Sequence, residues 1–121
     1  MGYVIPCPVR GYDQLTEDGK PVYYIVLPSL WLGQHAKRRD EALAKGSGAG
    51  QIGMALNFTV SIALLDDWRL PEESGLAGNP AGWDIDAVSL PFMSWISDAV
   101  LADFGACFDV KKKYSPQRKI G

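Results

Sequence analysis

Side chains that could do chemistry are few and far apart in this chain of 121 residues. Its single histidine, His35, has cations close by at positions 37–39, and no serine, cysteine or carboxylate is arranged to make it a catalytic base. We therefore expect His35 to be a structural histidine, on the surface or half-buried. We predict a protein that is not an enzyme and that needs no cofactor.

The two cysteines, Cys7 and Cys107, lie near opposite ends of the chain. Neither has a second cysteine or a histidine at the spacing of a metal site. A disulfide between them would close a loop of about 100 residues and stabilise the fold by several kcal/mol. The first residues lack the basic region and the long apolar region of a secretory signal, which favours two reduced thiols that pack as small apolar side chains.

Two acidic pairs and one glycine-rich stretch resemble ligand sites only superficially. The pairs Asp66/Asp67 and Asp84/Asp86 lack the surrounding glycine-containing pattern of a calcium loop, so we predict no metal site. Residues 46–50, Gly-Ser-Gly-Ala-Gly, lack the Gly-Lys-Ser/Thr ending of a phosphate loop and fall between two predicted helices. This stretch is predicted to be a flexible connector.

Charge is unevenly distributed, although the net charge is only −2. Residues 66–109 carry nine acids and one base, whereas residues 110–121 carry five bases and no acid. Such segments can pair within one molecule, between copies or with a partner, at below about 1 kcal/mol for each exposed pair. Apart from Tyr114, no aromatic residue is interleaved with the bases of the tail, which favours a solvated or protein-docking tail over specific nucleic-acid binding.

The first part of the chain predicts a small β element followed by a helix. Residues 22–27 are rich in β-branched and aromatic side chains and predict a strand, paired with residues 3–9 or 9–12. This strand or hairpin occupies about residues 3–27. Pro28 and Ser29 then predict a helix over residues 29–45, with Ser29 as its N-terminal cap.

The second part predicts two more helices. Residues 51–68 are nearly all apolar and predict the central, most buried helix, although a run of about 14 apolar-biased residues is too short to cross a bilayer. Residues 69–87 are predicted to form a loop, pinned to the surface by Trp83 and Ile85. A third helix is expected over residues 89–105, begun by Ser89 and ended by Gly105.

These elements predict a mainly α, three-helix single domain over residues 1–110, with the minor N-terminal β element and a basic tail at 111–121. Four tryptophans in a chain of this length are enough for one to anchor a partner. The residues predicted to contact a partner are three apolar anchors and the basic exit to the tail: Trp31, Phe92, Trp95, Lys111, Lys112 and Lys113.

The order of these features resembles a known family. Leu-Pro-Ser-Leu at 27–30, Asp-Trp-Arg-Leu at 67–70, Leu-Pro at 90–91 and Val-Lys at 110–111 are similar to the small tail assembly chaperones of long-tailed bacteriophages, over about residues 25–113. The resemblance implies a non-enzymatic role in the host cytoplasm. Many copies would bind the tape-measure protein, keep it soluble and transfer it to the major tail protein that forms the tail tube. Self-association is left open.

Two alternatives belong to other classes of protein. One is a small structural component of the virion, located in the tail or near the connector. The other is a phage inhibitor of a host enzyme or defence complex, which would use residues 66–87 as an acidic decoy. A chaperone is expected to be missing from finished particles, a structural protein to be present in fixed copy number, and an inhibitor to be dispensable for assembly.

Overall fold

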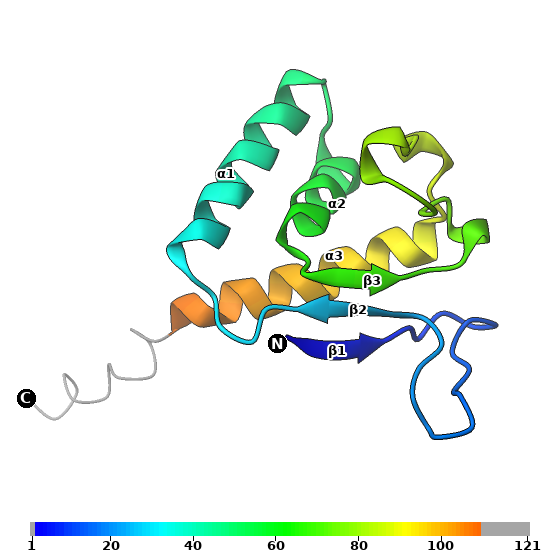
Figure 1. Ribbon diagram of the computed structural model, residues 1–121. Helices are drawn as coiled ribbons and strands as arrows, with labels where there is room; N and C mark the ends of the chain where they lie inside the picture. Colours follow the sequence, from blue (N-terminus) through cyan, green and yellow to red (C-terminus); the bar gives the residue numbers. More distant parts are fainter. Residues whose placement is uncertain (1, 110–121) are drawn as a thin grey trace, which may run out of the picture.

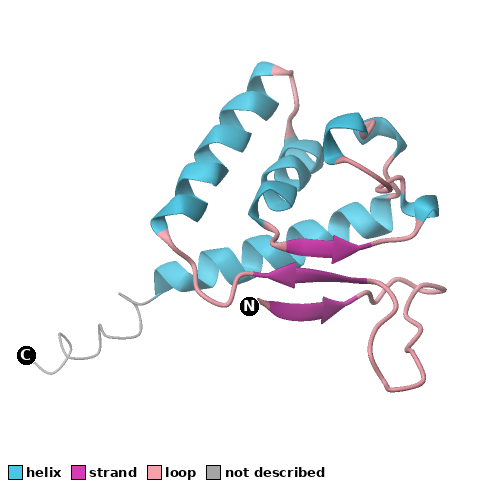
Figure 2. Ribbon diagram, in the orientation of Figure 1, coloured by secondary structure: helices cyan, strands magenta, loops and turns pink. Residues whose placement is uncertain are grey.

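The computed structural model describes residues 2–109, which form three α-helices and a three-stranded antiparallel sheet (Figure 1). Helix is the dominant structure (Figure 2), which confirms the predicted mainly α fold with a minor β element. In chain order the strands and α-helices are β1 (Tyr3–Pro6), β2 (Tyr24–Leu27), α1 (Gly33–Gly48), α2 (Gly53–Leu64), β3 (Asp67–Arg69) and α3 (Leu90–Ala106).

The sheet joins the N-terminal segment to the middle of the chain. Its strand order is β1-β2-β3, and Ile25 of the central strand is paired with Ile5 on one side and Trp68 on the other. The strand predicted over residues 22–27 is present but begins at Tyr24, and of the two predicted pairings the structure has the one with residues 3–9. The third strand differs from the prediction, which assigns residues 67 and 68 to the end of a helix and residue 69 to the loop that follows.

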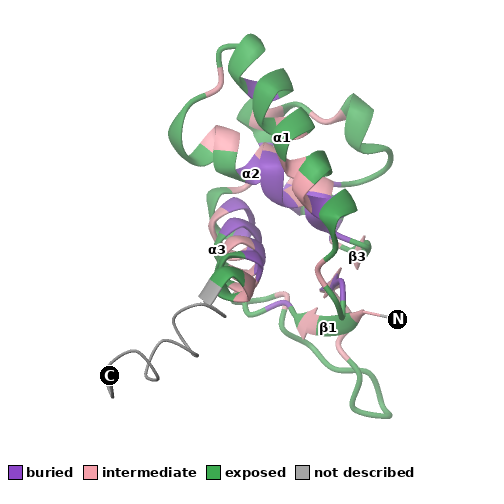
Figure 3. Ribbon diagram, turned by 90° about the vertical axis from the view of Figure 1, so that its left-hand side faces the viewer, coloured by how far each residue is buried: buried purple, intermediate pink, exposed green. Residues whose placement is uncertain are grey.

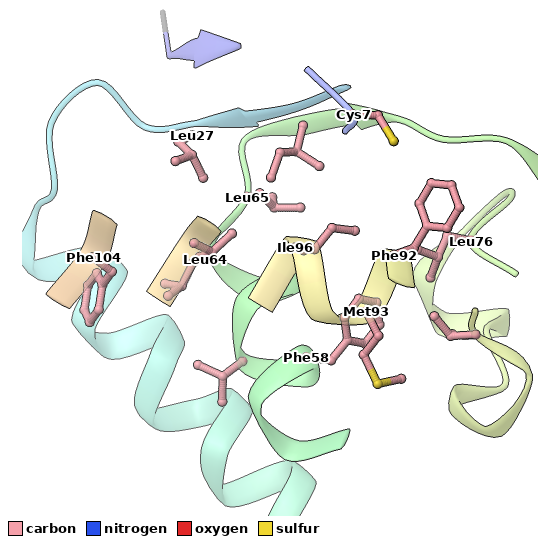
Figure 4. Packing of buried hydrophobic residues seen from close by; sticks show 14 residues of the cluster. Cys7, Leu27, Phe58, Leu64, Leu65, Leu76, Phe92, Met93, Ile96 and Phe104 are labelled. Carbon is pink, nitrogen blue, oxygen red and sulfur yellow. The ribbon is translucent and has the colours of Figure 1, made fainter. Parts of the chain in front are cut away.

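The core lies between the sheet, α2 and α3. Figure 4 shows Leu27 of the sheet, Leu64 of α2 and Ile96 of α3 directed into the same space. Helix α2 packs against both α1 and α3. Four of the 12 residues of α2 and six of the 17 residues of α3 are buried, so the two helices share the core about equally, and α2 has the central place expected for residues 51–68. Most of α1 faces solvent (Figure 3).

Helix α1 begins later than predicted, at Gly33 instead of residue 29, and Ser29 does not cap it. Residue Leu32 is the extended residue before the helix, and its backbone N–H donates to Nδ1 of His35 over 2.9 Å. Trp31 contacts Asp103 and Phe104 of α3, and these contacts keep the residues before Gly33 out of the helix. Helix α1 then continues through Gly46, which is buried, so the prediction of a connector over residues 46–50 is wrong for its first half.

Helix α2 is shorter than predicted because the sheet competes for its last residues. It ends at Leu64, and Leu65 has an extended backbone. The backbone N–H of Asp66 donates to the carbonyl of Val26 over 2.9 Å, and β3 then pairs with β2. Strand hydrogen bonds therefore replace the helical ones beyond Leu64. Helix α3 lies within one residue of its predicted bounds at each end, with Ser89 at the N-cap position and Gly105 inside the last turn.

The segment between β3 and α3 contains three short 3-10 turns: Glu72–Ser74, Pro80–Gly82 and Ile85–Ala87. Trp83 packs edge-on against Trp68 with ring centroids 5.7 Å apart, and its indole N–H donates to the carbonyl of Ala77. Trp83 and Ile85 are partly buried against the core, so the prediction that they pin this segment is confirmed. Within residues 2–109 no helix has the length and apolarity needed to cross a membrane.

The turn at Gly75 provides a test of this segment. Gly75 has a φ of +84°, and an added Cβ would lie 2.6 Å from the carbonyl oxygen of Ala87. Gly78 also has a positive φ but has open space around it. We expect Gly78→Ala to lower the free energy of unfolding by about 1–2 kcal/mol through backbone strain alone. Gly75→Ala should lower it by at least about 1 kcal/mol more, because it adds a steric clash.

Urea denaturation of the two variants checks this expectation. Equal losses of stability would show that the contact between Gly75 and Ala87 does not constrain the fold.

Candidate partner-binding surface

Trp31, the first of the predicted anchors, lies in the segment between β2 and α1 and is half-buried. Its indole N–H donates to Oδ2 of Asp103 on α3 over 2.9 Å. Its ring meets the ring of Phe104 edge-on, with centroids 5.0 Å apart. A polar and an apolar contact to the same helix therefore fix the orientation of Trp31.

The carboxylate of Asp103 also holds the N-terminal strand. Its other oxygen, Oδ1, accepts a hydrogen bond from the hydroxyl of Tyr3 over 2.9 Å. This bond, desolvation and the charge of Asp103 together raise the pKa of Tyr3 above its ordinary value of 10.0. One carboxylate thus joins β1, α3 and the segment that carries Trp31, by charge-assisted bonds that are stronger than neutral ones.

Exposed apolar side chains adjoin this junction, through direct contacts or as sequence neighbours of Trp31. Leu30 is 68% exposed and Phe108 is 60% exposed, and Leu32 and Tyr3 are also exposed. Phe108 packs edge-on against Phe104, the ring that contacts Trp31. We call the five residues Tyr3, Leu30, Trp31, Leu32 and Phe108 the Trp31 surface. Apolar groups that gather in this way are typical of protein-binding sites.

Two basic side chains support the Trp31 surface from α1. The guanidinium of Arg39 lies 5.5 Å from the centroid of the Phe104 ring, a cation–π arrangement. His35 is only 3% exposed and meets the ring of Trp31 edge-on at 5.2 Å. The prediction that His35 would be on the surface or half-buried is wrong. Its ring is buried at the start of α1, where Nδ1 accepts a hydrogen bond from the backbone N–H of Leu32.

The other predicted contact residues do not join this surface. Phe92 is 2% exposed and packs edge-on against Tyr12 at 5.3 Å, so its prediction as a partner anchor is wrong. The reason is that α3 buries one face, and Phe92 lies on that face. Trp95 is half-buried and packs against Phe92. Lys111, Lys112 and Lys113 lie outside the described residues.

Sequence reasoning did not identify Tyr3, Leu30, Leu32, Phe108 or Asp103. Leu30 and Leu32 did give a signal, because an apolar run of Leu-Trp-Leu just before a predominantly basic helix cannot direct every side chain inward. Nothing in the sequence links Tyr3 and Asp103, which are 100 residues apart. Only the fold brings them together.

The remaining candidate groups are the two cysteines and the acidic side chains. Cys7 and Cys107 are free thiols, and Cys7 is buried; this burial raises its pKa and makes it a poor nucleophile. In the described part of the chain, no three histidine, cysteine or acidic side chains gather closely enough to hold a metal ion. Comparisons of this chain with protein-family models, with curated proteins and with solved structures gave no match.

The bond between Tyr3 and Asp103 predicts a pH dependence of stability. Because the pKa of Tyr3 is higher in the folded state than in the unfolded state, the stabilisation by its hydroxyl is complete below about pH 10. It is lost as the pH rises through the folded-state pKa. We expect wild type to be more stable than Tyr3→Phe at pH 7 to 9, and the difference to shrink above about pH 10.

Thermal unfolding of both proteins across this pH range is the measurement. Tyr24→Phe serves as a control for general tyrosine ionisation, since no side-chain hydrogen bond forms at its hydroxyl within residues 2–109. A difference that stays constant to pH 11.5, well above the ordinary tyrosine pKa of about 10, would contradict the assigned bond.

Proposed function

We propose that this protein is a non-enzymatic assembly factor that binds other proteins, in the manner of the phage tail assembly chaperones it resembles. Its partners would be the tape-measure protein and the major tail protein, and it would act in the host cytoplasm. The observation that carries the proposal is the Trp31 surface. Its leucines, Tyr3 and Phe108 are exposed within residues 2–109, and its central aromatic ring is held by two contacts.

The rigidity of Trp31 favours binding. A partner that packs against a side chain already held by Asp103 and Phe104 loses little conformational entropy at that position. Tryptophan is among the residues that most often dominate binding energy at interfaces. The neighbouring leucines and Phe108 would exclude water around it, as the ring of weaker contacts does in known interfaces.

The charge pattern favours a partner that is apolar and acidic. Lys111 follows Phe108 by three positions in the sequence and begins a tail with five bases. Arg39, from α1, adds a guanidinium beside Phe104 that is also paired with Asp40 over 3.0 Å. A helix with an apolar stripe and flanking carboxylates has the complementary chemistry, because the stripe can cover the leucines while the carboxylates face the bases.

Two leucine substitutions test the surface itself. We expect Leu30→Glu together with Leu32→Glu to weaken binding of a co-expressed tape-measure protein by at least about tenfold, because each charge would be buried in an apolar interface. The thermal midpoint should stay within about 2 °C of wild type, because neither side chain is buried. Affinity measured by pull-down titration is the readout.

Ile52→Glu is the matched control, since Ile52 is an exposed apolar residue just before α2, far from Trp31 in the sequence. Equal weakening by Ile52→Glu would point to a general effect of added acid and would contradict the role of the Trp31 surface.

Charge reversal of Lys111, Lys112 and Lys113 tests the tail. The triple substitution to glutamate should leave the thermal midpoint almost unchanged and should weaken partner association, more strongly at low salt than at high salt. An unaltered affinity at low salt would show that the three lysines do not contribute to partner binding. The triple substitution to arginine, which keeps the charge, provides the comparison.

Mass spectrometry of finished particles separates this proposal from its alternatives. Absence from particles, combined with capture of the tape-measure protein, supports an assembly factor. Presence in fixed copy number would instead identify a structural component of the virion, and particle assembly without this protein would favour an inhibitor.

A further inference from the structure

A cavity of about 450 Å³ lies at the other end of α1 from the Trp31 surface. Its walls come from the last turns of α1, from α2 and from the segment that leads into α3. Aromatic and aliphatic side chains dominate its lining: Phe58, Ile62, Trp83, Ile85 and Val88, with Ala42, Ala63, Pro80 and Ala81. Lys45, Gln51 and Thr59 supply its polar groups.

A tight chain reversal at Gly46 brings Lys45 and Gln51 to the same cavity. The carbonyl of Gly46 accepts from the backbone N–H groups of both Ala49 and Gln51, and Gly50 has a φ of +83°. A Cβ on Gly46 would lie 2.7 Å from Oε1 of Gln51. The glycine therefore lets the side chain of Gln51 fold back onto α1.

The amide of Gln51 is oriented by α2. Its Oε1 accepts a hydrogen bond from the hydroxyl of Thr59 over 2.6 Å. With this oxygen engaged, the amide NH₂ group is the part of Gln51 that remains to bind a ligand. Gln51 thus lines the cavity with an amide that is held by Thr59 through its oxygen.

Lys45 contributes the positive charge. Its ammonium has no ion pair within the described residues, and no aspartate or glutamate lines the cavity. Asp84 and Asp86 belong to the same segment as Trp83 but do not line the cavity, whereas Glu41 and Arg38 line a neighbouring shallow hollow together with Lys45. The polar side of the cavity therefore offers donors and one positive charge.

We propose that this cavity binds a small carboxylate with an apolar, aromatic or branched body. The carboxylate is held by the Lys45 ammonium and the Gln51 amide, and the body lies against Phe58 and Trp83. The volume is within the range of small-molecule sites, about 300–1,000 Å³. A single lysine matches the single charge of a carboxylate. The apolar lining disfavours inorganic anions, which would lose hydration there without gaining apolar contacts. The site is independent of the proposed assembly role.

The test uses 3-phenylpropionate as the probe and the full chain labelled with ¹⁵N. We expect a saturable shift of the Trp83 indole resonance, assigned with a Trp83→Phe variant, and a Kd on the order of 1 mM for a fragment of this size. The uncharged amide of the same acid should bind about tenfold more weakly, because it loses the charge-assisted bonds. Acetate and inorganic phosphate, which lack the apolar body, should cause no saturable shift.

Three variants locate the site. Lys45→Met should weaken the probe about tenfold, while Lys37→Met, which removes a lysine from α1 outside the cavity, should not change the Kd. Ala63→Phe should fill the cavity and abolish binding, and retained dispersion of the amide resonances would show that it still folds. The double variant Leu30→Glu and Leu32→Glu should leave the probe affinity unchanged. The proposals for the cavity and for the Trp31 surface can therefore be disproved separately.

Several results would overturn the proposal. The absence of a saturable shift at the solubility limit of the probe would mean that the cavity takes no such ligand. Equal affinity for the acid and its amide, or an unchanged Kd for Lys45→Met, would show that the cavity does not recognise a carboxylate. If phosphate bound as strongly as the probe, the apolar body would not be a requirement for the ligand of this cavity.

Discussion

Burial of one face of α3 under the sheet and against α2 is the interaction on which the rest of this structure depends. Ile96 and Val100 have no exposed surface, and Phe92 and Phe104 extend the same buried face toward its two ends. Strands of only three or four residues are marginal by themselves, so this helix cover makes the sheet possible. Where the sheet forms, it also ends α2, because Asp66 and β3 bond to β2 instead of continuing the helix.

The Trp31 surface follows from the C-terminal end of that buried face. The ring of Phe104 packs against Trp31. The carboxylate of Asp103, the preceding residue on α3, accepts hydrogen bonds from both Trp31 and Tyr3. These contacts keep the segment before α1 extended, which directs Trp31 inward while Leu30 and Leu32 remain outside. The apolar side chains at this edge are therefore exposed while Trp31 between them is held in place by α3, and such rigidity would reduce the entropy lost by a partner in the binding that we propose.

The cavity at the opposite end of α1 has a separate origin. It depends on the reversal after Gly46 and on Trp83, which holds the segment before α3 against the sheet through Trp68. A helix of 16 residues is about 24 Å long, so the two sites occupy different ends of the protein. One offers exposed apolar side chains beside bases, and the other a partly open, mainly apolar pocket with a single cation.

The sequence by itself determined the mainly helical class, the presence of a strand within residues 22–27, and α3 to within one residue at each end, while it left two pairings of the strand open. These features follow from local propensity and from apolar periodicity, which are properties of neighbouring residues. Tertiary structure alone decided the start of α1, the end of α2 and the third strand, where contacts with distant residues outweigh local preference. It also decided which aromatic residues are exposed: Phe92 and Trp31 both belong to apolar stretches, but Phe92 faces the core, while Trp31 is held at the edge by a carboxylate 72 residues away.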